Sequence, residues 1–133
     1  KEVTMNTVIV KPGKVSIDPK LKRELKSLVE EEAQVIIHCE VVIPFNCGIR
    51  IWKNTNLLPH ESEKKIELVN AENISFYPIW THCETGYHHF TLIFKGLPKT
   101  CNTFDLFEDI PEPGGFIKTN IKRNNSDVYH IKL

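Results

Sequence analysis

Nitrogen and sulfur side chains gather in one short stretch, where His82, Cys83, His88 and His89 fall within eight positions. Such side chains suit zinc, and a structural zinc site normally closes with four of them. Neither a Cys-x-x-Cys nor a His-x-x-x-His spacing is present, however. His88 and His89 are also neighbours on a predicted strand and therefore point to opposite faces. We expect solvated histidines and no bound zinc.

The four cysteines are the candidate nucleophiles, at positions 39, 47, 83 and 101. Cys39 and Cys47 fall on apolar strand faces, where cysteine usually packs as a small hydrophobic residue. Cys83 and Cys101 lie in or beside predicted loops, with no oxyanion turn or orienting carboxylate to accompany them. The sequence therefore predicts no enzyme. Four cysteines permit two disulfides in three connectivities, which leaves the pairing and the redox compartment open.

Acidic residues concentrate at Asp105, Glu108, Asp109 and Glu112. Paired carboxylates can perform acid–base catalysis or hold calcium, but the Asp-x-Asp-x-Asp-Gly spacing of a calcium loop is missing. We expect these carboxylates to be solvated, with calcium as the alternative. Because the sequence also lacks a Gly-x-Gly-x-x-Gly motif and a Walker loop, it predicts no cofactor.

The candidate binding residues are aromatic side chains and one arginine. Ile49 and Ile51 are expected to face the core, so Arg50 and Trp52 on the same strand should face outward. Arginine and tryptophan are enriched at interface hot spots. Three interpretations are open for Trp52: a helix covers it, a partner contacts it, or it is exposed incidentally. If Trp52 packs internally, residues 80–87 remain as the candidate. The residues considered as ligand platforms are Trp52, Tyr77, Trp80 and Tyr87.

The elements that position these residues are mostly strands. Asp18 and Pro19 are typical of a helix start, and leucines at helical spacing predict one short helix near residues 19–31. From residue 34 onward, apolar and polar residues alternate in short runs separated by turns, which predicts an antiparallel β-sandwich. Polar loops are expected at 54–62 and 80–86. The predicted core is Cys39, Ile49, Ile51, Leu68, Phe90, Leu92, Phe94, Phe104 and Leu106.

Composition narrows the class of protein. The 133 residues fit a single domain, predicted to span 1–133, and 17 basic residues balance 17 acidic ones. Without a basic excess, nucleic-acid binding is not expected. No apolar run approaches the roughly 20 residues that span a bilayer. The first residue is Lys1 and not Met, as expected of a mature or excised piece.

Several short segments in fixed order carry a resemblance to a known family. The last is the most telling, since a Leu97-Pro98 turn is followed by Thr-Phe-Asp-Leu-Phe-Glu at 103–108. The others are residues 49–51 with 55–57, residues 65–68 with 71–74, and residues 90–94. Over about residues 34–133, the chain resembles an uncharacterised immunoglobulin-like β-sandwich domain of exported Bacteroidetes proteins.

The resemblance implies an immunoglobulin-like fold and export to the periplasm or the cell surface. Such domains are accessory modules, sometimes preceding thioredoxin-like or hydrolase domains, so the partner would be a protein or another domain of a longer chain. The resemblance transfers no catalytic residue. The function expected is a noncatalytic accessory or interaction module. The alternative is a carbohydrate- or peptide-binding domain that uses exposed aromatic residues, with Arg50, Trp52, Trp80 and Tyr87 as binding residues.

Overall fold

A computed structural model describes residues 33–133, which belong to one compact unit, Glu31–Leu133. The helix predicted near residues 19–31, which would have supplied leucines to cover Trp52, lies outside the described residues. Every regular element in the described part is a strand. The strands are β1 (Gln34–Ile43), β2 (Cys47–Ile49), β3 (Thr55–Pro59), β4 (Ile66–Glu72), β5 (Thr81–Cys83), β6 (Gly86–Lys95), β7 (Thr103–Glu108), β8 (Ile117–Lys122) and β9 (Val128–Lys132).

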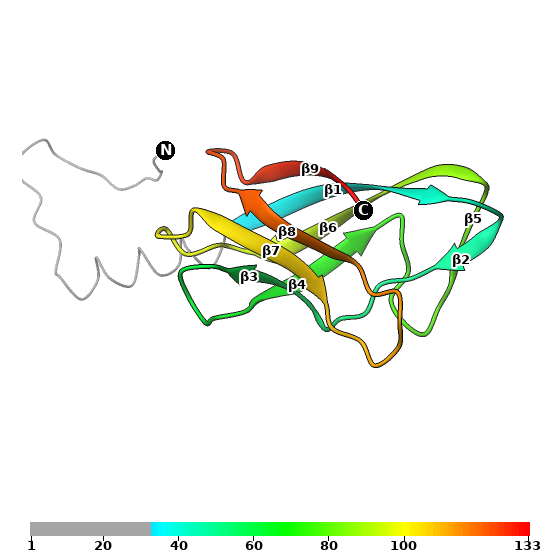
Figure 1. Ribbon diagram of the computed structural model, residues 1–133, viewed down its shortest axis with the longest axis horizontal. Helices are drawn as coiled ribbons and strands as arrows, with labels where there is room; N and C mark the ends of the chain where they lie inside the picture. Colours follow the sequence, from blue (N-terminus) through cyan, green and yellow to red (C-terminus); the bar gives the residue numbers. More distant parts are fainter. Residues whose placement is uncertain (1–32) are drawn as a thin grey trace, which may run out of the picture. The chain divides into compact units, whose positions relative to one another are not determined.

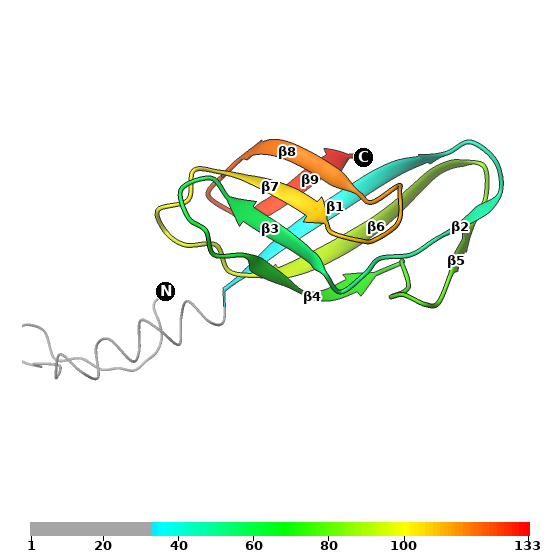
Figure 2. The same ribbon diagram turned by 60° about the horizontal axis from the view of Figure 1, so that its bottom comes forward.

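Seven strands form one curled sheet in the order β8-β7-β3-β4-β6-β1-β9, and β2 pairs with β5 in a small separate ladder (Figures 1 and 2). Although β8 and β9 are opposite edges of the sheet, only residues 123–127 connect them. Such a link spans at most about 20 Å. The sheet must therefore curl until its two edges come close together.

One strand pair departs from the expected antiparallel arrangement. β9 runs parallel to β1, with His38 opposite His130, while the other pairs in the seven-stranded sheet are antiparallel. The chain crosses from one edge of the sheet to the other before β9, and it arrives there in the direction of β1. The sheet is thus mixed, and the expectation of a purely antiparallel sheet was wrong at this pair.

The central pair, β1 with β6, aligns ten residues of each strand without interruption. Val35, Ile37 and Cys39 point inward from β1, opposite Phe94, Leu92 and Phe90 of β6. Side chains with period two place one apolar face toward the core, as the sequence predicted.

The core fills the inside of the curl. Phe104 of β7 meets Tyr129 of β9 edge-to-face, with ring centroids 5.2 Å apart, so distant parts of the sheet pack against each other. The prediction of the core is confirmed for seven of its nine residues. Cys39, Ile51, Phe90, Leu92, Phe94, Phe104 and Leu106 are buried in one cluster, and Ile49 and Leu68 pack partly buried against it.

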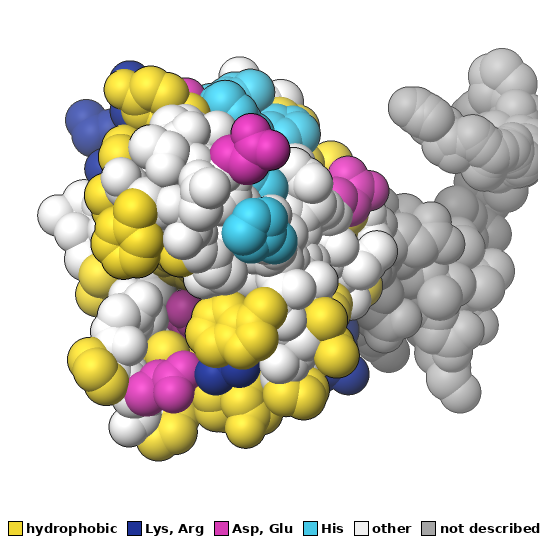
Figure 3. Space-filling model, turned by 90° about the vertical axis from the view of Figure 1, so that its right-hand side faces the viewer, with side chains coloured by type: hydrophobic (Ala, Val, Ile, Leu, Met, Phe, Trp, Pro, Cys, Tyr) yellow, Lys and Arg dark blue, Asp and Glu magenta, His cyan; other side chains and the backbone are white. Residues whose placement is uncertain are grey.

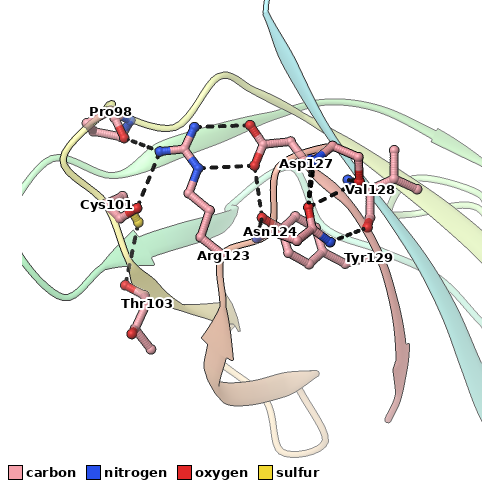
Figure 4. A network of polar contacts seen from close by, with 9 residues as sticks. Pro98, Cys101, Thr103, Arg123, Asn124, Asp127, Val128 and Tyr129 are labelled. Carbon is pink, nitrogen blue, oxygen red and sulfur yellow. Dashed lines mark hydrogen bonds and ion pairs between the residues drawn. The ribbon is translucent and has the colours of Figure 1, made fainter.

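Arg123 fixes the short link between the two sheet edges (Figure 4). Its guanidinium donates to both carboxylate oxygens of Asp127, at 3.2 and 3.1 Å, and to the carbonyls of Pro98 and Cys101. Tyr129 donates its hydroxyl to Asp127 at 2.8 Å, and burial raises the pKa of this phenol to about 12. This network ties the β8–β9 turn to the loop between β6 and β7.

Two segments expected to be loops contain strands. β3, within the expected loop 54–62, is an inner strand of the sheet between β4 and β7. The sequence pattern did not reveal this strand, because it contains the polar residues Thr55 and Asn56. Both are buried, with local hydrogen bonds: Thr55 Oγ1 donates to the Trp52 carbonyl at 2.5 Å. β5 lies within the expected loop 80–86, and it pairs with β2 over only three residues.

Candidate functional site

Arg50 lies between two aromatic rings just after β2. Its guanidinium carbon is 3.8 Å from the centre of the Trp80 ring and 4.5 Å from that of Tyr77. Arg50 Nη2 pairs with Glu112 Oε1 at 3.3 Å, and Nη1 donates to the Pro78 carbonyl at 3.4 Å. The Arg50 side chain is only 14% exposed. Aromatic residues from the segment before β5 therefore cover most of Arg50.

Trp52 continues the same series of contacts. Its ring stacks on Tyr77 with centroids 3.8 Å apart and planes 24° from parallel. The contacts thus link four planar groups in the order Trp80, Arg50, Tyr77 and Trp52. Trp52 is half-buried and packs on Tyr77, while the helix expected to cover it lies outside the described residues. Residues 80–87 are the other binding candidate that the sequence predicts, and Trp80 lies in this range.

Glu108 is a buried carboxylate that binds the backbone next to these planar side chains. Oε2 accepts a hydrogen bond from the Trp52 backbone N–H at 2.9 Å, and Oε1 accepts one from the Phe116 N–H at 3.0 Å. The residue is 4% exposed, so the expectation of a solvated carboxylate was wrong at this position. Burial raises the pKa of Glu108, and this outweighs the opposing effect of its two backbone donors. We call Arg50, Trp52, Tyr77, Trp80, Glu108 and Glu112 the Arg50 cluster.

The other acidic residues do not assemble with Glu108 into an ion site. Asp105, on the same strand, accepts from His60 Nε2 at 2.7 Å and from the Asn120 N–H at 2.9 Å. Glu112 pairs with Arg50 and remains half exposed.

Trp80 is the part of the Arg50 cluster that reaches solvent, with 58% of its surface exposed. It packs on Arg50, and it also lies over Gly48, where an added Cβ would come within 3.0 Å of the indole. Beside it, Ile79 and Tyr77 are exposed as well. Trp80 therefore presents a large apolar surface to solvent while its other face packs on Arg50 and Gly48.

Figure 3 views the end of the described domain that carries β2 and β5. Hydrophobic side chains gather over its lower part, with a basic and an acidic side chain between them. A hollow of about 220 Å³ adjoins Trp80, lined also by Arg50, Ile110, Pro113 and Phe116. Aromatic, aliphatic and charged groups thus share one concave surface, which can accept an apolar side chain of a partner.

Tyr87, the fourth predicted binding residue, does not line this hollow. It lies on β6 opposite Val42 of β1, and both side chains are largely exposed. The structure therefore brings Arg50, Trp52 and Trp80 together and places Tyr87 on a different strand pair.

The histidines near β5 separate as their spacing predicted. His88 Nε2 contacts the Asn73 carbonyl at 2.8 Å, while His89 Nε2 contacts Glu40 Oε1 at 3.0 Å. Cys83 is buried and His82 is exposed. Within residues 33–133, no group of three or more histidine, cysteine, aspartate or glutamate side chains is arranged to hold a metal ion.

Sequence reasoning missed a second hollow, of about 410 Å³, on the outer face of β1, β6 and β9. Its lining includes His38 and His130, whose rings stack with centroids 4.9 Å apart, and His89 with Glu40. His38 also contacts Thr91 Oγ1 at 2.9 Å. The parallel register of β1 and β9 brings the two histidines together, and no local pattern in the sequence signals that register.

Comparison with known proteins adds no further constraint. No family model matches the chain, and the searches of curated proteins and of solved structures found no match either. Among the described residues, no helix has the length and apolar character needed to cross a membrane.

Proposed function

We propose that this chain is a noncatalytic interaction module that binds a protein or peptide segment through Trp80 and the adjoining hollow. One observation carries the proposal: a tryptophan that is 58% exposed is held in place by stacking on Arg50 and by close packing over Gly48. Tryptophan, tyrosine and arginine dominate interface hot spots. A side chain held before binding also loses less conformational entropy when the partner arrives.

The surroundings of Trp80 favour a peptide over a carbohydrate. Ile79 and Tyr77 extend the exposed apolar surface, and Ile110 lines the hollow. Besides the buried Glu108, the charged residues that line the hollow are Arg50 and Glu112, which are paired with each other. A sugar ring needs free hydrogen-bonding groups around the aromatic platform, whereas an apolar peptide side chain needs mainly buried area.

The finer description of the domain belongs to the same proposal. We take the curled sheet as an immunoglobulin-like sandwich and the chain as an accessory module of an exported bacterial protein, located in the periplasm or at the cell surface. Support for the fold comes from the packing of Phe104 against Tyr129 across the curl. Support for export comes from the sequence resemblance to exported Bacteroidetes domains.

Selection of random phage-displayed peptides on the immobilised chain tests the binding proposal. We expect peptides with an apolar anchor to bind the wild type and Tyr87→Ala, and to lose at least about thirtyfold in affinity on Trp80→Ala. Tyr87→Ala is the matched control, because it removes an aromatic residue that is also largely exposed but lies outside the Arg50 cluster. Peptides that bind Trp80→Ala as tightly as the wild type would refute the proposal. So would binding to immobilised glycans with no peptide selected.

A further inference from the structure

The small ladder of β2 and β5 places two cysteines directly opposite each other. Cys47 pairs with Cys83 in register, followed by Gly48 with His82 and Ile49 with Thr81. In an antiparallel pair, directly opposed side chains project from the same face, with Cβ atoms about 4.5–5.5 Å apart. A disulfide needs Cβ atoms roughly 3.5–4.5 Å apart and Cα atoms roughly 4.4–6.8 Å apart. A small adjustment of the ladder is therefore enough for bonding.

Cys39 and Cys101 are not paired with another cysteine across a strand ladder. Cys39 is opposite Phe90 on one side and Ile131 on the other, inside the core. Burial raises the pKa of its thiol to about 12, which makes it a poor nucleophile. Cys101 is buried, and its thiol donates to the Thr103 carbonyl at 3.5 Å. Both remain free cysteines, as all four are in this structure.

We propose that Cys47 and Cys83 form an intrachain disulfide when the domain meets a thiol–disulfide oxidant such as glutathione disulfide. The inference is independent of the proposed function, because it rests on the register of β2 and β5. It selects one pair among the four cysteines, whose pairing the sequence left open.

The exchange proceeds in two balanced steps. Cys47, the more exposed thiol, loses its proton and attacks one sulfur of glutathione disulfide, which releases one glutathione thiolate and forms a mixed disulfide. Cys83 then loses its proton and attacks the Cys47 sulfur, which releases the second glutathione thiolate. Two electrons pass to glutathione, and the two protons end on the two glutathione thiols. Burial and the neighbouring Cys47 raise the pKa of Cys83, which fits its role as the second attacker.

The bond would close a loop that contains much of the Arg50 cluster. Residues 48–82 include Arg50, Trp52, Tyr77 and Trp80, and Gly48 follows Cys47 directly beneath the indole. Closing a loop of this length restricts the unfolded chain and raises the midpoint of thermal unfolding. The crosslink would also join β2, whose Gly48 lies beneath Trp80, to β5, which begins directly after Trp80.

Incubation of the full 133-residue chain with glutathione redox buffers tests the proposal. After blocking free thiols, digestion following Glu40 separates Cys39 from Cys47, so mass spectrometry can assign each cysteine. We expect one crosslink, between the peptides of Cys47 and Cys83, with Cys39 and Cys101 blocked as free thiols. A stable mixed disulfide of Cys47 with glutathione, or a crosslink that includes Cys39 or Cys101, would overturn the proposal.

Thermal unfolding provides the second readout. The oxidised wild type should unfold about 5–20 °C above its reduced form. Cys47→Ser, which leaves the buried Cys83 in place, should show no difference between the two conditions. Cys101→Ala is the matched control and should retain the oxidation-dependent rise. Equal midpoints for oxidised and reduced wild type, or an equal rise in Cys47→Ser, would contradict the assignment.

Discussion

The β1–β6 pair and the Arg50 cluster stabilise the domain in different ways. In β1–β6, ten consecutive residue pairs continue one repeating pattern, and aliphatic and aromatic side chains fill the core. In the Arg50 cluster, planar side chains from three separate segments, at residues 50–52, 77–80 and 108–112, stack and pair next to β2 and β5. The first region buries apolar side chains in the core, and the second region presents aromatic and charged side chains at the surface.

Truncating a central core residue tests the first half of the comparison. Phe94 is fully buried on β6 between Val35 and Leu68 of the neighbouring strands. Phe94→Ala should lower the free energy of unfolding by about 3–5 kcal/mol, measured by urea denaturation. Phe45→Ala, which truncates an exposed phenylalanine, is the control and should change it by less than about 0.5 kcal/mol. A loss below about 1 kcal/mol for Phe94→Ala would show that β6 faces the other way.

Substitution of Glu108 should produce the next largest loss in the free energy of unfolding. Each of its oxygens accepts one backbone N–H, from Trp52 and from Phe116. In Glu108→Gln, the amide NH₂ must face one of these donors and leaves it unsatisfied in a buried position. We expect the free energy of unfolding to fall by about 1–3 kcal/mol. Glu112→Gln, at an exposed carboxylate, is the control, and an equal loss in both variants would argue against a special role for Glu108.

The same carboxylate gives the stability a pH dependence of known sign. Burial raises the folded-state pKa of Glu108, so the native protein holds this proton more tightly than the unfolded chain does. The contribution is complete below the unfolded pKa, at about pH 4, and is lost as the pH rises through the folded pKa. The stability of the wild type relative to Glu108→Gln should therefore decline from pH 4 upward. A relative stability that increases over this range would contradict the burial account.

Substitution of Arg50 tests the stacking of the planar side chains and should cause a smaller loss of stability. Arg50→Ala removes two cation–π contacts and the pair with Glu112, which should lower the free energy of unfolding by about 1–2 kcal/mol. Arg50→Lys keeps the charge but not the planar group, so it should restore only part of the loss. Near-ultraviolet circular dichroism should show weakened tryptophan signals in both variants. If Arg50→Lys restores the full wild-type spectrum, charge and not stacking holds Trp80.

The sequence predicts the core of this fold better than its candidate site. Alternation in β1 and β6 identifies the inward residues, because each strand's own pattern determines them. β3 was missed because Thr55 and Asn56 look like loop residues until their burial between two strands is known. The outward position of Arg50 followed from alternation, but its cover by Tyr77 and Trp80 depends on the bridge between Ile51 and Phe76. Pairings of this kind, like the register of Cys47 with Cys83, join distant segments through three residues or fewer and leave no periodic signal.

Affinity for a selected peptide, measured on wild type and Trp80→Ala, tests the central claim most directly. The claim is that Trp80 contacts the bound peptide, while the other residues of the Arg50 cluster stabilise the fold. Trp80→Ala should change the free energy of unfolding by no more than about 1 kcal/mol, yet weaken peptide binding by about 2 kcal/mol or more, roughly thirtyfold. Wild-type affinity in a folded Trp80→Ala variant would contradict the account.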